Sequence, residues 1–307
     1  MTIGTALTVE GTGNSVDTVI AQARTAADAG IGAVWLGQRY DYDAIALAGI
    51  IGREVPEVSV GTSAVPIFGR HPLIVAAQAQ TAQAATHGRF ELGLALGTRI
   101  LTESAFGIEF RRPAQRLEEF LTVARTVLST GSVDFHGTEI TASTTLPTRL
   151  PGADTVPPIL VAALGPRALS VAGRLADGIL PFLANPTVLE RDIVPALHAA
   201  ADEAGRPAPR VVALVPTLVT DNPDAGRAEL ASATALYDTI PSYRRVIELG
   251  GQSTAAEVGL IGSADAVRAG LRDYRNAGAT EIIVTQTGLL GPDVERATWE
   301  AVAGAGN

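Results

Sequence analysis

Two short segments contain the groups best suited to chemistry. The segment "VGTSAVPIFGRHP" (60–72) begins as an apolar strand and ends in Arg70 and His71, directly before a proline that is typical of a helix start. The segment "LGPRAL" (164–169) leads from a strand into a helix, where free backbone N–H groups and the helix dipole favour an anion. We therefore expect a polar, anion-binding face where these strands end.

The composition excludes several other kinds of site. The chain has no cysteine, which rules out disulfides and thiolate ligands, and all 23 of its Lys and Arg residues are arginine, which rules out lysine Schiff-base chemistry. The four histidines form no HExxH or His-x-His pair, so we expect no metal. A net charge of −9 argues against a nucleic-acid partner, because binding to nucleic acid requires a clustered basic surface.

The bulk properties indicate a folded globular protein. Hydrophobic residues make up 47% and charged residues 18% of 307 positions, enough to form a sizeable core. The apolar run "AIALAGIIG" (44–52) ends at Arg53, well short of the ~20 residues that cross a bilayer. The first residues lack the pattern of a signal peptide. We expect a cytoplasmic protein without a membrane partner.

A repeating order of strand and helix runs along the chain. Apolar runs typical of strands occupy 3–9, 32–37, 57–67, 89–96, 159–164, 178–183, 210–220 and 281–286. Helical patterns occupy 15–30, 41–52, 72–86, 113–130, 166–176, 186–205 and 263–278, with two more helical segments within 223–250. Apolar runs without clean alternation indicate parallel strands that are covered on both sides. We predict an α/β fold, a (β/α)8 TIM barrel forming one domain over residues 1–307.

An irregular stretch interrupts this order between strands 4 and 5. Residues 131–158 are predicted to be a small insertion, a hairpin around His136-Gly137 followed by a polar loop. A doubly wound open sheet is the alternative fold, but "EGTGNS" (10–15) lacks the glycine spacing of its phosphate-binding turn.

On the helix 113–130, Arg116, Glu118 and Glu119 are expected to form structural ion pairs.

In such a barrel the chemistry lies where strands end and the following loops begin. Four segments that include several of these strand ends resemble, in order, the luciferase-like monooxygenase superfamily. They are residues 61–97 ("GTSAVPIFGRHP…GLALG"), 112–125 ("RPAQRLEEFLTVAR"), 157–182 ("PPILVAALGPRAL…GILPF") and 261–284 ("IGSADAVRAGL…EIIV"). The chain most resembles the branch that uses the deazaflavin coenzyme F420, with FMN as the alternative cofactor.

The resemblance implies where the cofactor binds. A cis peptide between Ser63 and Ala64 is expected behind the cofactor ring. The alternative is that the residues of "GTSA" are small only because they pack in a corner of the barrel. The loop after the fifth strand is expected beside the phosphate arm, although Pro166 also suits an ordinary helix start. The implied cofactor contacts are Gln38, Ser63, Ala64, Gly97, Thr98, Gly165, Pro166 and Arg167.

The chain departs from its F420-dependent dehydrogenase relatives at the positions that act on substrate. Relatives carry an acid–histidine pair after the second strand, where this chain has Gln38 and Arg39, and sugar-phosphate relatives carry an acid where it has Thr98. The first-strand glutamate is matched by Glu10. These departures disfavour sugar-phosphate oxidation. They favour a reductase whose proton comes from Glu10, Tyr40 or water, although Tyr40 also suits a half-buried rim position.

Three functions follow from these observations. The first is hydride transfer between F420 and a small organic substrate, in the direction of reduction. The second is an FMN-dependent monooxygenase, and the third is a barrel without catalysis that binds a cofactor or acts as a scaffold. The resemblance also implies a homodimer, for which the sequence provides no independent argument.

Overall fold

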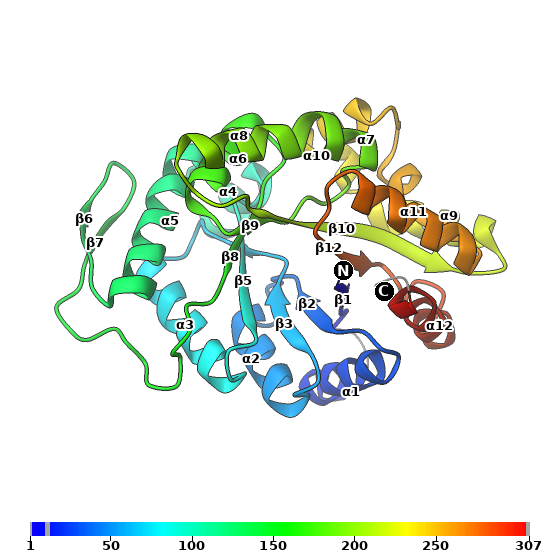
Figure 1. Ribbon diagram of the computed structural model, residues 1–307, viewed down its shortest axis with the longest axis horizontal. Helices are drawn as coiled ribbons and strands as arrows, with labels where there is room; N and C mark the ends of the chain where they lie inside the picture. Colours follow the sequence, from blue (N-terminus) through cyan, green and yellow to red (C-terminus); the bar gives the residue numbers. More distant parts are fainter. Residues whose placement is uncertain (1, 10–12, 305–307) are drawn as a thin grey trace.

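Eight parallel strands close into a barrel in the computed structural model, which describes residues 2–9 and 13–304 (Figure 1). Around the barrel they are β1 (Ile3–Ala6), β2 (Ala33–Leu36), β3 (Ser59–Thr62), β5 (Phe90–Ala95), β8 (Ile159–Ala162), β9 (Gly178–Ile179), β10 (Arg210–Val219) and β12 (Glu281–Thr285). The last strand pairs with β1, with Gly4 opposite Ile283, and thereby closes the ring. Each barrel strand lies within a predicted run, so the predicted (β/α)8 barrel is confirmed.

Helices surround the barrel, as Figure 1 shows. They are α1 (Ser15–Asp28), α2 (Ala44–Glu54), α3 (Pro72–Ala85), α4 (Arg99–Phe106), α5 (Pro113–Thr130), α6 (Pro166–Leu175), α7 (Pro186–Val188), α8 (Val194–Glu203), α9 (Pro223–Thr234), α10 (Pro241–Leu249), α11 (Ala264–Asn276) and α12 (Pro292–Ala303). Single turns are η1 (Leu189–Ile193), η2 (Tyr237–Thr239) and η3 (Ala255–Val258). Helix α4 lies in a stretch expected to be a loop, because eight residues are too few to establish a helical period.

The largest side chain in the barrel interior is that of Trp35. Trp35 of β2 is 1% exposed and packs with Leu160, Leu180 and Val212, among others, in a cluster separate from the core beneath the helices. Gly61 on the neighbouring strand makes this possible, because a Cβ there would lie 2.5 Å from the indole ring. The barrel is therefore a packed core, and a ligand has access only at its ends.

The third strand is interrupted by a cis peptide bond between Ser63 and Ala64, as expected from the family resemblance. Strand β4 (Val65–Pro66) resumes the pairing with β5 after the interruption. Between the two pieces the Thr62 hydroxyl donates to the Gly93 carbonyl and accepts from the Gly93 N–H, both at 2.9 Å. The Thr62 side chain thus forms the hydrogen bonds to the Gly93 backbone that a neighbouring strand would otherwise form.

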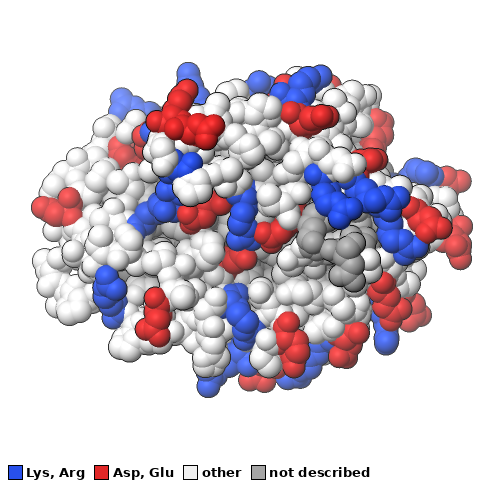
Figure 2. Space-filling model, in the orientation of Figure 1, with Lys and Arg blue, Asp and Glu red and all other residues white. Residues whose placement is uncertain are grey.

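Charged side chains meet at the amino ends of the strands. Arg210 begins β10 and lies 2.9 Å from a Glu91 oxygen and 2.5 Å from a Glu281 oxygen, with both carboxylates mostly buried. Burial raises the pKa of Glu91; the Arg210 charge opposes this rise and the Glu281 charge adds to it. Acidic and basic side chains are interspersed over the molecular face shown in Figure 2. In (β/α)8 barrels, residues at the amino ends of the strands contribute to stability.

The predicted hairpin is present and is attached to α5 by one carboxylate. Strands β6 (Asp134–His136) and β7 (Thr141–Ser143) pair antiparallel between the fourth and fifth barrel strands. Glu119 is 3% exposed and accepts from the N–H groups of Thr138, Glu139 and Ile140 at 2.8–2.9 Å and from the Gln115 amide. The expected ion pair of Glu119 is therefore wrong: its partners are uncharged N–H groups.

The neighbouring charged residues of α5 have different partners. Glu118 pairs with Arg174 at 2.8 Å, as expected. The Arg116 guanidinium instead lies over the ring of Phe68, 4.9 Å from its centroid. Among the described residues, Glu118 is thus the only one of the three that forms an ion pair, and its partner lies on α6 and not on the same helix.

Replacing Glu119 by glutamine is expected to loosen the hairpin. Burial acts to raise the pKa of Glu119, but the Gln115 amide and the three backbone N–H groups hold it below its ordinary value. The carboxylate therefore stabilises the fold above the ordinary glutamate pKa, and this contribution is lost as pH falls through the depressed pKa. We expect E119Q to cost about 1–3 kcal/mol at pH 7.

Amide hydrogen exchange measures the effect of E119Q locally. Exchange at Thr138–Ile140 should accelerate in E119Q, and the difference from wild type should shrink at acid pH. E118Q is the matched control on the same helix, because the Glu118 ion pair is partly exposed. Unchanged exchange at 138–140 would contradict the prediction.

An additional strand organises one end of the molecule. Strand β11 (Leu260–Gly262) pairs with the last three residues of β10, Thr217–Val219. Because the chain leaves the carboxyl end of β10 and returns beside it, residues 220–259 lie at the carboxyl-end face of the barrel. Among the helices in the described ranges, none is long and apolar enough to cross a membrane.

Candidate functional site

Small side chains surround the axis of the barrel at the carboxyl ends of the strands. Ala6, Ala64 and Ala162 pack against the interior cluster that contains Trp35, yet each remains partly exposed. Gly37 is close to this group, because a Cβ there would lie 3.6 Å from the Ser63 carbonyl oxygen. The ends of β1, β2, β3 and β8 therefore form an apolar floor of small residues above the filled barrel.

A hydrogen-bonded network joins the loops after the second and third strands. The Gln38 amide donates to the Arg39 and Tyr42 carbonyls, and its oxygen accepts from the Ala44 N–H and the Arg70 guanidinium. Arg70 also forms two 3.1 Å contacts with Asp43. The bonding capacity of the Gln38 side chain is thus used within the protein. The Gln38 side chain therefore positions this loop, and its contact with the cofactor stays a prediction.

His71 connects the same loop to the hairpin. Its Nδ1 accepts from the Leu73 N–H at 3.3 Å and caps α3, while its Nε2 lies 3.0 Å from the Thr141 carbonyl of β7. Since a carbonyl only accepts, the ring fits the tautomer with hydrogen on Nε2. His71 therefore orders the loop, and Arg70 beside it serves the same purpose through Asp43.

The loop after the fourth barrel strand contains two of the expected cofactor contacts. Gly97 has a positive φ of 74°, and Thr98 caps α4 by accepting from the Leu101 N–H. Tyr40 lies on the same side of the site, with its ring against Phe106 of α4 at 6.0 Å. It is 71% exposed, which is more than the half-buried rim position considered from the sequence.

The start of α6 is uncapped and open. Gly165 precedes the helix, Pro166 is its first residue, and no side chain caps its N–H groups. A Cβ added to Gly165 would meet no atom within 4 Å, and Arg167 is exposed in the same turn. The unpaired N–H groups, the helix dipole and an arginine therefore lie beside free space.

Three aromatic side chains form a cluster over the ends of β9 and β10. Phe182 lies 5.1 Å from Tyr237 and 5.8 Å from Tyr243, and the two tyrosine rings are 5.0 Å apart, all edge to face. Burial raises the pKa of Tyr237 and of Tyr243. Sequence analysis did not identify the tyrosines, because they lie in the segment between β10 and β11 and follow no motif.

Glu10, predicted as a proton donor, lies outside the described residues. Of the other predicted site residues, Gln38, Ser63 and Ala64 lie together at one part of the rim of the barrel. Gly97 lies close to Pro66 of β4, since a Cβ there would be 3.6 Å from the proline Cβ. Tyr40 faces outward beside α4.

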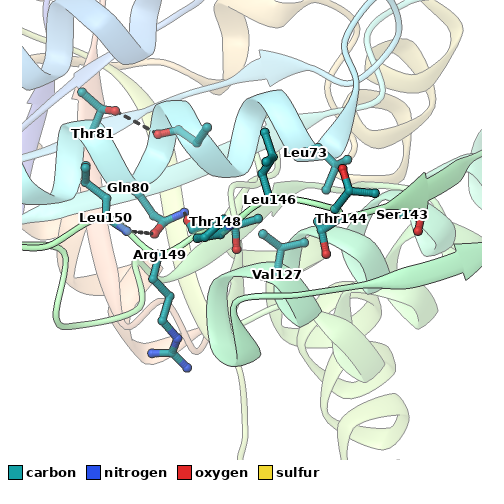
Figure 3. A pocket seen from close by; sticks show the side chains of 13 residues that line it. Leu73, Gln80, Thr81, Val127, Ser143, Thr144, Leu146, Thr148, Arg149 and Leu150 are labelled. Carbon is teal, nitrogen blue, oxygen red and sulfur yellow. Dashed lines mark hydrogen bonds between the residues drawn. The ribbon is translucent and has the colours of Figure 1, made fainter.

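A separate cavity of about 430 Å³ lies outside the barrel between α3 and the loop 143–150 (Figure 3). Gln80 attaches this loop to α3 by donating to the Thr148 carbonyl and accepting from the Leu150 N–H. Arg149 points away from the loop and donates to the Ser129 carbonyl. Since its lining comes from α3, α5 and this loop, the cavity is distinct from the strand ends.

Comparisons with known proteins agree with this architecture. Residues 1–281 match the family model described as luciferase-like monooxygenase. An uncharacterized protein of Mycobacterium tuberculosis is 30% identical over 206 residues, which cover 62% of this chain and 60% of that protein. The 5,10-methylenetetrahydromethanopterin reductase of Methanopyrus kandleri is 24% identical over 318 residues, 89% of each chain. The chain thus spans about three fifths of the length of the first relative and most of the second.

Solved structures share the fold across the whole chain. An F420-dependent secondary alcohol dehydrogenase in complex with an F420-acetone adduct superposes with a TM-score of 0.83 at 19% identity, covering 100% of this chain and 99% of that one. The oxygenating constituent of 3,6-diketocamphane monooxygenase of Pseudomonas putida, in complex with FMN, gives 0.78 at 15% identity, covering 99% and 97%. Neighbours of this fold therefore bind either F420 or FMN.

Proposed function

Because the chain belongs to the luciferase-like monooxygenase family, we propose that it is an oxidoreductase that uses reduced coenzyme F420 to reduce a small organic acceptor. Family membership and the fold support a flavin- or deazaflavin-dependent oxidoreductase, and the choice of F420 and of direction is the proposal. The M. kandleri reductase, which is similar over 89% of this chain, supports the direction of reduction.

The start of α6 is the observation that carries the proposal. F420 and FMN both have a phosphate-bearing side arm, and a phosphate is favoured by unpaired N–H groups at a helix N-terminus. Here those groups have no side-chain cap, and Gly165 leaves open the space through which a phosphate would approach. Arg167 would supply the opposite charge. These residues fit a phosphorylated cofactor arm.

The strand ends fit the ring of the same cofactor. Ala64 and Ala162 present small apolar surfaces beside the Ser63-Ala64 bond, with Trp35 closing the barrel beneath them. Gly97 and Thr98 would contact the ring from the fourth strand. When bound, the reduced deazaflavin supplies the hydride; the chain orients the ring, excludes water below it and provides the proton.

Glu10 and Tyr40 are the proposed proton donors in this scheme. Tyr40 has its phenol in contact with solvent, from which a transferred proton could be replaced. The absence of histidine at Gln38 and Arg39, together with Thr98 in place of an acid, supports an acceptor other than a sugar phosphate. A homodimer, commonly formed by relatives, belongs to the same proposal.

Titration of the purified protein with F420 and with FMN tests the proposal. We expect F420 to bind in the micromolar range or tighter, with a change in its absorbance or fluorescence, and FMN to bind at least tenfold more weakly. Oxidation of reduced F420 by a carbonyl acceptor should follow. Tight FMN binding without affinity for F420 would overturn the F420 assignment and favour the monooxygenase.

Replacing Gly165 by alanine is expected to weaken cofactor binding while the protein still folds. The φ of −92° suits alanine and the added methyl meets no protein atom, so the fold should lose only about 1 kcal/mol, because alanine is a poorer N-cap residue than glycine. A phosphate at the N–H groups of α6 would meet that methyl. We expect the dissociation constant for F420 to rise about tenfold in G165A, or roughly 1.4 kcal/mol.

Gly304→Ala provides the matched control for G165A. Gly304 also has an ordinary φ and open space around its Cβ position, but it follows α12 and takes no part in the site. G304A should bind F420 like wild type. Equal F420 affinity in G165A and wild type would remove α6 from the phosphate site.

A further inference from the structure

The aromatic cluster beside the barrel axis has a composition that suits the acceptor side of the reaction. Phe182 packs against the same interior cluster as Ala64 and Ala162, so its ring reaches the floor on which we place the cofactor ring. Tyr237 and Tyr243 contact Phe182 from η2 and α10, in the segment that covers the carboxyl-end face. The cluster thus extends from the proposed reaction centre outward.

The two phenol groups lack partners within the described part of the chain. Neither Tyr237 nor Tyr243 has a hydrogen bond from its hydroxyl to any described protein group, and both residues are partly exposed, with neither oxygen among the fully buried unpaired atoms. Half-buried tyrosines usually pair their hydroxyl groups with an acceptor. Both hydroxyls are therefore available to an acceptor atom that arrives from outside. A tyrosine hydroxyl with its ordinary pKa of about 10 is protonated at neutral pH and can donate, and burial raises the pKa of both groups further.

Charged neighbours of the cluster are engaged elsewhere. Asp238, next to Tyr237, accepts from the Ala255 N–H at 2.7 Å, and Arg244, next to Tyr243, donates to Glu248 at 2.9 Å. The surface formed by the three rings is consequently aromatic, with hydroxyls as its polar groups. Such a surface favours an uncharged molecule that carries an oxygen.

We propose that Phe182, Tyr237 and Tyr243 form the acceptor-binding wall, and that the two phenols donate hydrogen bonds to the oxygen of an uncharged, largely apolar carbonyl compound. This inference rests on the proposed function, with a carbonyl compound as the acceptor. The hydride of reduced F420 adds to the carbonyl carbon, the π electron pair of the C=O bond moves to the oxygen, and the oxygen takes up the proton from the proposed donor, which gives an alcohol and oxidised F420. The hydrogen bonds hold the carbonyl in place and stabilise the negative charge that develops on its oxygen. The rings bind the apolar remainder.

Two probes that differ in one atom test the wall directly. Cyclohexanone and methylenecyclohexane have the same ring, but only the ketone accepts hydrogen bonds. Their binding to the protein saturated with oxidised F420, where no turnover occurs, is measured by calorimetry. We expect wild type to bind the ketone about tenfold more tightly. The Y237F/Y243F double variant should bind both probes equally within about twofold.

Further variants separate the roles of the three rings. F182L should weaken both probes by a similar factor, because it removes aromatic surface and no donor. In turnover with cyclohexanone and reduced F420, kcat/KM should fall about tenfold in the double variant, while F420 affinity stays unchanged. Y274F is the control, because Tyr274 is buried on α11 outside the cluster.

The outcomes distinguish this inference from the proposed function. Failure of wild type to bind F420 would overturn the proposed function, as seen in the first titration. If F420 binds, then persistent preference for the ketone in Y237F/Y243F would overturn the role of the phenols. Failure of the F420-loaded wild type to bind cyclohexanone would overturn the carbonyl acceptor. Loss of preference in Y274F would show that the effect is not specific to the cluster.

Discussion

Replacing Gly93 by alanine is expected to prevent the protein from folding stably. A Cβ at this position would lie 1.7 Å from the Thr62 carbonyl oxygen and 2.7 Å from Leu180. The oxygen belongs to the backbone of a central strand, so it cannot move aside as a flexible side chain would. We expect a loss of more than about 4 kcal/mol, a large part of the stability of an ordinary domain.

Soluble yield and denaturant unfolding measure this effect. Gly32→Ala is the matched control, because a Cβ at Gly32 would meet only the end of the Thr2 side chain, at 3.8 Å. G32A should remain soluble and unfold close to wild type. A G93A protein with wild-type stability would show that β3 and β5 approach each other less closely than the structure indicates.

The Thr62 hydroxyl provides a milder test of the same junction. T62V keeps the shape of the side chain but leaves the Gly93 N–H and carbonyl without their hydroxyl partner, which should cost about 2–3 kcal/mol. T62S retains the hydroxyl and should recover most of the loss. Equal stability of T62V and T62S would contradict the role given to the hydroxyl.

Replacing Arg210 by methionine is expected to have the second largest effect. The substitution leaves Glu91 and Glu281, which are 18% and 17% exposed, facing each other without their cation. Removing one partner from a buried pair typically costs 3–5 kcal/mol. Because the Arg210 side chain is 31% exposed and partly screened, we expect about 3 kcal/mol at pH 7.

The pH dependence of R210M identifies the cause. Burial already raises the pKa of Glu91, and the Arg210 charge opposes that rise, so its removal raises the pKa further. For an acid with a raised folded pKa, stability is full below the unfolded value of about 4.3 and is lost as pH rises through the folded value. Denaturant unfolding should therefore show R210M approaching wild type as pH falls.

Two further variants complete the test of Arg210. E91Q/R210M/E281Q removes both carboxylate charges and should recover much of the lost stability at pH 7. R24M is the control, because Arg24 pairs with Glu54 on the surface at 3.5 Å and should change stability by less than about 1 kcal/mol. A loss in R210M that does not vary with pH would indicate lost packing instead of unpaired carboxylates.

Much of the architecture could be predicted from the chain alone. Eight apolar runs with helical segments between them predict the barrel, because local period and turn residues reflect the burial of each element. The order of the elements then places "LGPRAL" at a strand end and a helix start. The missing lysine, cysteine and metal motifs are likewise properties of composition.

Local patterns were less informative where a side chain had several possible partners. Helical spacing suggested an ion pair for Glu119, but the hairpin that follows brings three N–H groups to its carboxylate. For Gln38 the sequence suggested only a cofactor contact, and it did not show that Arg70 from the next loop donates to the Gln38 amide oxygen. In both cases the partner belongs to another element, whose approach depends on packing.

The sequence by itself therefore determined the barrel and the helix start that suits a phosphate, and it indicated the end of the barrel at which the candidate site lies. These features depend on the hydrophobic period, the composition and the order of the elements, all of which can be read along the chain without knowing which distant segments touch. Only the tertiary structure brought Phe182, Tyr237 and Tyr243 together, because contact between distant segments depends on how the segment 220–259 lies over the barrel. The same holds for Arg70 and His71: their positions follow from the sequence, but their bonds to Asp43 and Thr141 follow from the fold.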